Sequence, residues 1–328
     1  MNKRRKLVFA LSAGVFAMPI ALLAQQSPKI ARIGFLGNDS ASGFAQQVEA
    51  FRAGLRELGY VEGKNIVIEY RWAEGNLARL PDLANELVRS KVDVMVTNGT
   101  PGGRAAQHAT TTIPIVIINV GDPVGFGFVK SLARPGGNIT GLSGQSAEFV
   151  GKQLELLLEI VPKGTRVAVL GNTDNTGHAV GIKHVQTAAQ RTGTSIQPLF
   201  ARTPLEIENA FAMMVGQKSG AVIVMPTPLS RGQRSQFAEL SLKARLPSIT
   251  TYREQVEGGM LMSYGPDVSS QFVRAASYVD KILKGAKPGD LPVEQPTTFD
   301  LAVNMKTAKT LGIKIPNSIL VQATKVIE

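Results

Sequence analysis

The 328-residue chain contains no cysteine. This absence excludes disulfide bonds, zinc sites with thiolate ligands and cysteine nucleophiles. It also excludes the acylated cysteine that anchors bacterial lipoproteins. Histidine is nearly as scarce, with three residues, and His178 and His184 are spaced so that one helix would not present both on one face. The composition therefore offers neither a thiol nor a histidine pair for metal binding or covalent chemistry.

Motifs for phosphate binding and hydrolysis are missing as well. Gly136 and Gly141 have the spacing of a P-loop, but Leu142-Ser143 follows without the lysine that contacts phosphates. No dinucleotide fingerprint follows the predicted strands, and there is no G-x-S-x-G nucleophile elbow. We therefore expect a protein without a cofactor that is not an enzyme. The alternative is an exported enzyme that uses Asp122 and Asp174 as an acid/base pair.

The chain is basic, with 36 Lys and Arg against 25 Asp and Glu and a formal net charge of +11. A basic protein raises the question of a nucleic-acid partner. Here the basic residues are scattered along predicted helices and loops, and no cluster is interleaved with aromatic residues. Scattered charge is typical of a solvated surface, so we expect no nucleic-acid partner.

The N-terminus has the pattern of a cleaved signal peptide covering residues 1–24. The basic segment Lys3–Lys6 precedes the apolar stretch Leu7–Leu23, and Ala24 is a small residue suited to cleavage. The alternative is a membrane anchor, because the stretch approaches spanning length. The polar linker Gln25–Pro28 favours cleavage. Without a cysteine for a lipid, we expect a free periplasmic protein with no stable membrane insertion.

The remainder of the chain repeats one pattern of buried strands. Arg32–Asn38 (RIGFLGN) and Arg166–Asn172 (RVAVLGN) both end in Leu-Gly-Asn before a predicted helix. Two further pairs follow in the same order: Asp93–Thr97 with Ala221–Met225, and Ile113–Val116 with Leu246–Ile249. Three matched pairs in the same order indicate an internal repeat and hence two similar lobes.

Helical patterns alternate with these strands, which predicts parallel sheets covered by helices on both faces. The expected class is α/β, with two Rossmann-like lobes. The repeat is interrupted near residues 140–145, 260–266 and 291–298, so we expect three crossings between the lobes that form a three-strand hinge. The expected lobes are residues 29–142 plus 264–292, and residues 143–263 plus 293–328.

Small polar residues follow the predicted strands, where open α/β sheets bind their ligands. These candidates for ligand binding are Asn38, Asp39, Ser40, Gly99, Thr100, Asp122, Asn172, Thr173, Asn175, Thr227 and Tyr252. The alternative role for the Ser, Thr, Asn and Asp residues is helix capping. Asp122 is placed to meet a ligand ammonium, or else to cap a helix beginning at Pro123. Tyr252 offers an aromatic wall, with packing as its alternative.

Three longer segments resemble the periplasmic substrate-binding proteins of ABC transporters, in the branch that includes tryptophan- and tyrosine-binding proteins. They are Phe51–Gly75 (FRAGLRELGYVEGKNIVIEYRWAEG), Ile113–Ser143 (IPIVIINVGDPVGFGFVKSLARPGGNITGLS) and Gly258–Asp267 (GGMLMSYGPD). The resemblance implies a type I binding-protein fold that encloses a small solute, an amino acid or small carboxylate, between two closing lobes. It adds Ser143 to the ligand loops and implies that Thr100 holds a carboxylate and Asp122 an ammonium group.

The resemblance also implies partners, namely an ABC permease and its ATPase. We expect the receptor to be a monomer, although no residue pattern excludes a dimer. The alternative function is a periplasmic component that presents its ligand to a signalling receptor. It differs in the partner and not in the cleft, so the sequence leaves it open.

Overall fold

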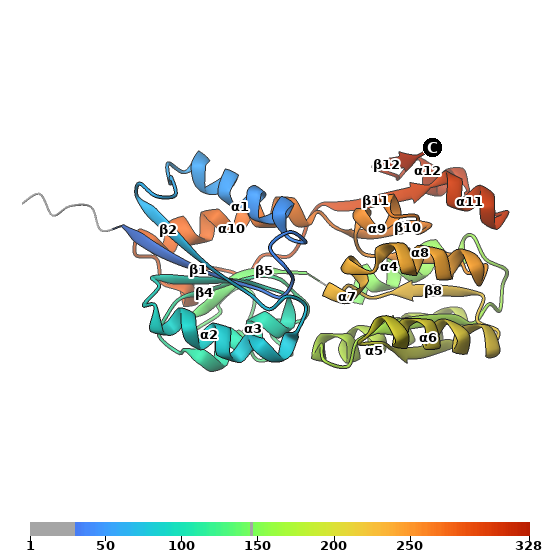
Figure 1. The fold of residues 1–328 in the computed structure, drawn as a ribbon, viewed down its shortest axis with the longest axis horizontal. Helices are drawn as coiled ribbons and strands as arrows, with labels where there is room; N and C mark the ends of the chain where they lie inside the picture. The colour runs from blue at the N-terminus through green and yellow to red at the C-terminus, as the bar shows by residue number, and fades with distance from the viewer. Residues whose placement is uncertain (1–29, 145–146) are drawn as a thin grey trace, which may run out of the picture.

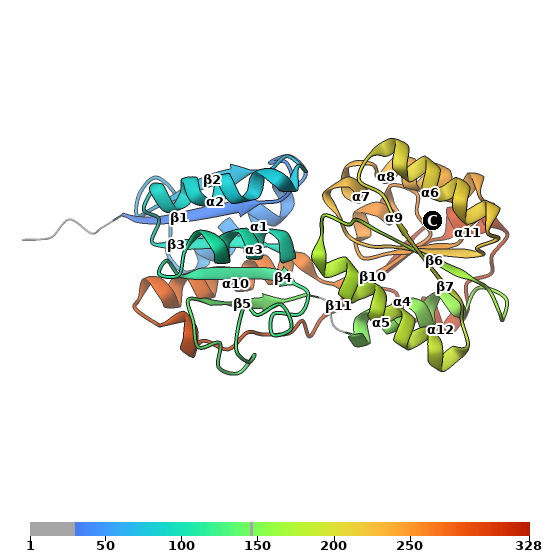
Figure 2. The ribbon, with the colours of Figure 1, turned by 90° about the horizontal axis from the view of Figure 1, so that it is seen from below.

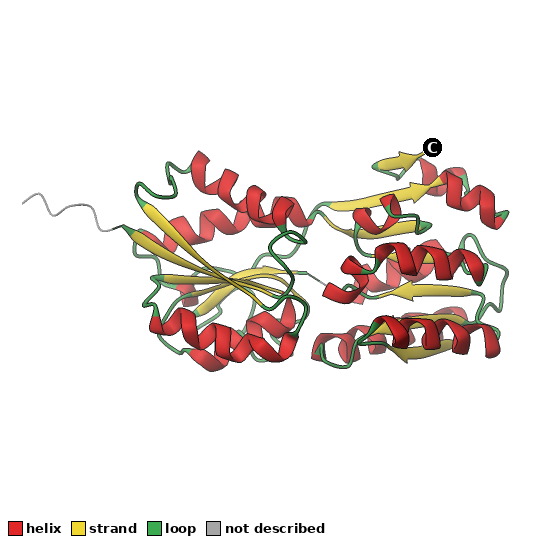
Figure 3. Ribbon diagram, viewed as in Figure 1, coloured by secondary structure: helices red, strands yellow, loops and turns green. Residues whose placement is uncertain are grey.

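The computed structural model describes residues 30–144 and 147–328, so the predicted signal peptide lies outside the described residues. These residues form two lobes side by side along the long axis of the molecule (Figure 1). Each lobe is a sheet with helices on both faces (Figure 3). None of the described helices is long and apolar enough to cross a membrane. The predicted α/β class with two lobes is confirmed.

The N-terminal lobe contains a parallel five-stranded sheet in the order β2-β1-β3-β4-β5. Its strands are β1 (Ala31–Gly37), β2 (Ile66–Trp72), β3 (Val94–Asn98), β4 (Ile115–Val120) and β5 (Ile139–Ser143). One face carries α1 (Ala45–Glu57) and α10 (Val268–Leu283), and the other α2 (Leu80–Arg89) and α3 (Gly99–Ala109). The short η1 (Leu77–Arg79) precedes α2. Both faces of the sheet are therefore buried, as the apolar strands require.

The C-terminal lobe contains a seven-stranded sheet in the order β12-β11-β10-β9-β8-β6-β7. Its strands are β6 (Val167–Gly171), β7 (Ile196–Phe200), β8 (Ala221–Val224), β9 (Ser248–Thr250), β10 (Met262–Pro266), β11 (Phe299–Asn304) and β12 (Lys325–Ile327). Its helices are α4 (Ala147–Leu158), α5 (Thr176–Thr192), α6 (Pro204–Gly216), α7 (Pro228–Gly232), α8 (Arg234–Lys243), α9 (Arg253–Glu257), α11 (Met305–Leu311) and α12 (Asn317–Leu320).

The core of the C-terminal lobe has two layers, one on each face of the sheet, because the side chains along each strand alternate between the faces. Val167 and Val169 of β6 pack in the cluster with residues of α4 and α5, whereas Ala168 and Leu170 pack with residues of α6 and α8. Successive side chains of a strand point to opposite faces, so a fully apolar strand serves both layers. Figure 2 shows α5 and α6 on opposite sides of the sheet.

The strand order confirms the internal repeat. The five strands of the first lobe follow the order 2-1-3-4-5, and β7-β6-β8-β9-β10 follows the same order in the second. This order reverses direction between the first and third strands of each set, which leaves a crevice at the carboxyl ends of those strands.

Two strands depart from the predicted parallel sheets, because β11 runs antiparallel to β10 and β12 is paired parallel to β11. The chain leaves the C-terminal lobe at the end of β10 and enters α10 of the other lobe. It returns to the same end, where Pro266 is paired with Phe299, and so runs back in the opposite direction.

The chain passes between the lobes between β5 and α4, between β10 and α10, and between η2 (Pro288–Asp290) and β11. Ser143 is the last residue of β5, and Tyr264 lies inside β10. Val293 packs in the core of the N-terminal lobe. The exact bounds of the two lobes stay a prediction. The first and third segments also contact each other, because Ser143 N–H donates to the Glu294 carbonyl at 2.9 Å.

Candidate functional site

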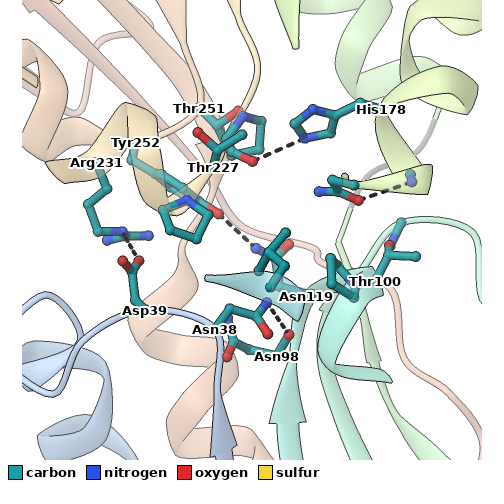
Figure 4. Close-up of a pocket in the computed structure, with 18 of the residues that line it drawn as sticks. Asn38, Asp39, Asn98, Thr100, Asn119, His178, Thr227, Arg231, Thr251 and Tyr252 are labelled. Atoms are coloured by element: carbon teal, nitrogen blue, oxygen red, sulfur yellow. Dashed lines mark hydrogen bonds and ion pairs between the residues drawn. The ribbon is translucent and has the colours of Figure 1, made fainter. Parts of the chain in front are cut away.

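A cavity of about 80 Å³ lies where the two lobes face each other. The loops after three strands of each sheet line it, at the carboxyl ends of β1, β3 and β4 and of β6, β8 and β9. Figure 4 shows residues of both lobes around it. The lining residues are Asn38, Asp39, Phe44, Leu77, Asn98, Gly99, Thr100, Pro101, Asn119, Gly121, Asn175, Gly177, His178, Pro226, Thr227, Pro228, Arg231, Thr251 and Tyr252.

Two asparagines at the carboxyl ends of β1 and β3 bring buried amide oxygens to this cavity. Asn38 is 7% exposed, and its Nδ2 donates to the Asn98 carbonyl at 2.8 Å. The Oδ1 atoms of Asn38 and Asn98 are both buried and accept no hydrogen bond. An unsatisfied buried acceptor costs about 1–3 kcal/mol, so a ligand that donates hydrogen bonds here is favoured.

The start of α3 presents hydrogen-bond donors to the cavity, in contrast to the acceptor oxygens of the two asparagines. Gly99 and Thr100 form its first turn and line the cavity, and the N-cap residue Asn98 makes no side-chain capping bond. The first N–H groups of a helix lack partners within the helix and carry the positive end of its dipole. This end of the cavity is therefore suited to an anionic group such as a carboxylate.

A buried ion pair joins the lobes across the cavity. Nε of Arg231 lies 3.3 Å from Oδ2 of Asp39, and Nη1 of Arg231 lies 3.4 Å from Oε1 of Glu254. Burial raises the pKa of the Asp39 carboxyl above its usual value, and the Arg231 guanidinium opposes this shift. The two charges that line the cavity balance, so the site suits a ligand with no net charge.

Aromatic rings flank the same guanidinium. Cζ of Arg231 lies 5.0 Å from the Phe44 ring centre and 4.5 Å from the Tyr252 ring centre. The Tyr252 hydroxyl accepts a hydrogen bond of 3.2 Å from Nδ2 of Asn119, which makes a second contact between the lobes. Burial raises the pKa of the Tyr252 hydroxyl, which keeps it neutral.

Asn119 reaches the cavity because the backbone of β4 is irregular there. Its φ is +53°, in the left-handed region, and the register between β4 and β5 shifts between Ile117 and Val120. Such irregularities redirect side chains beside binding sites.

His178 of α5 lines the cavity on the side of the C-terminal lobe, and the residue is 2% exposed. Its Nδ1 accepts from the Asn172 N–H at 2.9 Å, which leaves Nε2 to donate to the Pro226 carbonyl at 3.1 Å. Burial lowers the pKa of His178 to about 4, so the ring is neutral at physiological pH. The neutral ring links the loops after β6 and β8.

This burial makes the stability of the protein depend on pH. Between pH 6.5 and about 4, the unfolded chain binds a proton at His178 that the folded protein does not bind. Acidification through this window is therefore expected to lower the free energy of unfolding by up to about 3 kcal/mol from this residue alone. Denaturant unfolding measured at several pH values checks this prediction. His178→Gln is expected to flatten the slope of the free energy of unfolding against pH in this window. His184→Gln, on the same helix but outside the cavity lining, should keep the slope. An unchanged slope in His178→Gln would contradict the assignment.

The described residues, 30–144 and 147–328, contain no group of three or more His, Cys, Asp or Glu side chains arranged to hold a metal ion. The polar side-chain groups of the cavity are amides, hydroxyls, one imidazole, one carboxylate and one guanidinium. Such groups offer hydrogen bonds and charge to a ligand.

Comparison with known proteins identifies the family. The model of the ABC transporter substrate binding protein family matches residues 29–327. The chain belongs to this family. The resemblance found in the sequence is thereby confirmed.

This substrate-binding protein is similar to several known proteins. It is 28% identical over 267 residues to a tyrosine-binding protein of Clostridioides difficile strain R20291, covering 81% of this chain and 76% of the relative. A conserved domain protein from Vibrio cholerae O1 biovar El Tor is 30% identical, with a TM-score of 0.85 over 91% of this chain and 100% of that one.

Two further solved structures, each 26% identical, differ in their reported state. The ABC domain of Streptococcus pneumonia in complex with L-Trp gives a TM-score of 0.84 over 90% of this chain and 99% of that one. The ligand-free, open structure of a substrate binding protein with adhesive properties from Clostridium difficile gives 0.67 over 91% and 99%.

The structure brings seven of the predicted ligand-binding residues together around the cavity. They are Asn38, Asp39, Gly99, Thr100, Asn175, Thr227 and Tyr252. They lie together because the carboxyl ends of parallel strands share one edge of each sheet. That these residues contact a ligand stays a prediction.

Five predicted residues lie outside the lining. Three of them make hydrogen bonds within their own loops, and Ser143 contacts another segment of the chain. Ser40 Oγ accepts from Gly43 N–H and Asp122 Oδ1 from Gly125 N–H, at 3.0 and 2.8 Å. Asn172 Oδ1 accepts from Asp174 N–H at 2.8 Å, and the Ser143 hydroxyl donates to the Glu294 carbonyl at 3.3 Å. Thr173 is exposed. No helix begins at Pro123, where the chain forms turns, and Asp122 stabilises this turn through its bond to Gly125. Asp39 supplies the carboxylate of the cavity.

Sequence reasoning missed Arg231 and Asn119, the two side chains that make polar contacts between the lobes at the cavity. Arg231 had a readable signal: Thr227-Pro228 begins a helix, and Thr227 and Ser230 form a capping box, which places Arg231 one turn from the cleft. Asn119 had none, because its orientation depends on the irregularity in β4.

Proposed function

We propose that this protein is the extracytoplasmic receptor of an ABC importer and that it captures an α-amino acid between its lobes. One observation carries the proposal. The cavity pairs a free helix N-terminus with a carboxylate and two unsatisfied amide oxygens. These groups complement the carboxylate and ammonium of one zwitterion. The names of the relatives, which include tyrosine binding and a complex with L-Trp, support the same ligand class.

In this proposal each end of the cavity has one role. The carboxylate of the ligand accepts hydrogen bonds from the first N–H groups of α3 and from the Thr100 hydroxyl. The ammonium group donates to Asp39 and to the amide oxygens of Asn38 and Asn98. We also propose that the protein is exported and that it is a soluble monomer in the periplasm. It would deliver its ligand to a permease and its ATPase.

Lobe closure is the mechanism that the contacts favour. Polar contacts across the cleft join Asp39 to Arg231 and Asn119 to Tyr252. At equal sequence identity, the protein superimposes better on the complex with L-Trp than on the ligand-free, open relative. Both observations support the interpretation that the two lobes are closed on each other in this structure. Three crossings allow bending about the hinge, and a ligand that contacts both lobes stabilises the closed form.

The decisive experiment is binding by the mature chain, from residue 25, after unfolding and refolding to remove co-purified ligand. We expect saturable calorimetric binding of at least one L-amino acid. At about a hundred times its dissociation constant, such a ligand should raise the free energy of unfolding by about 2.7 kcal/mol. Ribose and simple dicarboxylates serve as controls. Stabilisation by one of these with none by any amino acid would contradict the proposal.

A close approach between the two helix starts gives a separate test of closure. A Cβ atom at Gly177 would lie 2.9 Å from Oγ1 of Thr100 in the other lobe. Gly177→Ala should therefore disfavour the closed form and weaken ligand binding about 10-fold, since affinity falls with the fraction of molecules able to close. Gly216→Ala, where a Cβ atom meets nothing within 4 Å, is the matched control. Calorimetric titration of both variants checks the prediction, and equal affinities would argue against closure at this contact.

A further inference from the structure

The guanidinium of Arg231 occupies the aromatic end of the cavity. It lies between the rings of Phe44 and Tyr252, both of which line the cavity, and the residue is 8% exposed. A planar cation between two ring faces fills the position in which an aromatic ligand side chain would stack.

Partners from both lobes hold the guanidinium in this position. Asp39 contacts Nε from the N-terminal lobe and Glu254 contacts Nη1 from the start of α9. Glu254 is itself fixed by Gln47 of α1, whose Nε2 donates to Oε1 at 3.3 Å. Moving Arg231 out of the closed cavity would break both ion pairs and both ring contacts. Its position is therefore part of the closed structure.

The space that remains is small. The cavity measures about 80 Å³, whereas a cavity of roughly 150 Å³ holds a benzene molecule in a protein core. The ligand must also fit its carboxylate and ammonium groups into the same volume. An indole or phenol side chain does not fit while Arg231 remains in place.

We infer that Arg231 is a specificity-determining residue that restricts this receptor to α-amino acids with compact, uncharged side chains, such as glycine, alanine and serine. The inference rests on the proposed function and narrows it. Arg231 acts as an internal substitute for the ligand side chain and excludes the aromatic amino acids named for two of the relatives. Its charge is balanced by Asp39, so it does not call for an acidic ligand.

The test compares two ligands in one protein. The dissociation constants of L-alanine and L-tryptophan are measured by calorimetry for the refolded mature chain, for Arg231→Ala and for Arg231→Gln. The wild-type protein should bind alanine and bind tryptophan at least about 10-fold more weakly. In both variants the ratio of the tryptophan constant to the alanine constant should fall at least about 10-fold. The ratio cancels any effect of the lost ion pair on the shared zwitterion.

Arg253→Ala is the matched control. Arg253 lies in the same lobe and is ion-paired with Asp300, Nε to Oδ2 at 2.8 Å, but it does not line the cavity. The ratio of the tryptophan constant to the alanine constant in Arg253→Ala should equal that of the wild type. Wild-type binding of tryptophan as tightly as alanine, or of L-aspartate more tightly than either, would overturn the inference and leave the proposed function standing. An unchanged ratio in both Arg231 variants would also overturn it. Binding of no amino acid at all would overturn the proposed function itself.

Discussion

Asp39→Asn is expected to weaken amino-acid binding roughly 10- to 100-fold, because a hydrogen bond to a charged group contributes about 1.5–3 kcal/mol. The substitution keeps the shape of the side chain and removes the carboxylate that faces both the cavity and Arg231. Calorimetric titration with the tightest amino-acid ligand measures the loss. Denaturant unfolding of the unliganded variant separates it from any change in stability.

Asp122→Asn is the control, and it also tests the assignment made from the sequence. Oδ1 of Asp122 accepts from Gly125 within its own loop, and the residue does not line the cavity. Its affinity for the same ligand should stay within about 3-fold of the wild type, well below the effect of a charged hydrogen bond. A larger loss in Asp122→Asn than in Asp39→Asn would return the ammonium role to Asp122.

Gly141→Ala is expected to lower the free energy of unfolding by about 3 kcal/mol or more. Gly141 lies in β5 with φ of +134°, a conformation that favours glycine. A Cβ atom there would overlap the carbonyl oxygen of Ile117 and lie 2.7 Å from its amide nitrogen. Because both neighbours are backbone atoms of the adjacent strand β4, no side-chain rotation relieves the overlap.

Gly137→Ala is the matched control, since it stands in the same loop-to-strand segment and its Cβ atom would meet nothing within 4 Å. Denaturant unfolding followed by circular dichroism compares the two variants. Only Gly141→Ala should lose substantial stability. Similar unfolding free energies for the pair would show that β5 adjusts around a side chain at residue 141.

The fold and the position of the cleft were predictable because they depend on local patterns. The Leu-Gly-Asn strand ends recur in both halves, and parallel strands bring their carboxyl ends to one edge. Asn38, Thr100 and Thr227 line the cavity for this reason. The same pattern also selects residues that cap their own loops, such as Ser40 and Asp122, because both uses favour the same short polar side chains.

The contacts between the lobes were not predictable from one sequence. The pair formed by Asp39 and Arg231 joins residues far apart in the chain, and its geometry depends on how the lobes meet. The direction of Asn119 depends on a left-handed backbone conformation that sequence spacing does not reveal. Charge balance and ligand size therefore require the three-dimensional structure.

The position of α10 has a consequence for the order of folding. This helix supplies Phe272 and Tyr278 to the core around β1 and α1, although the whole C-terminal sheet up to β10 precedes it in the chain. A ribosome or a translocation channel that releases the chain from its N-terminus thus delivers the last piece of the first lobe only after most of the second. Contacts of such high sequence separation form slowly. The apolar face of α1 should therefore remain uncovered until residue 283 has emerged, and chaperone binding would be most useful during that interval.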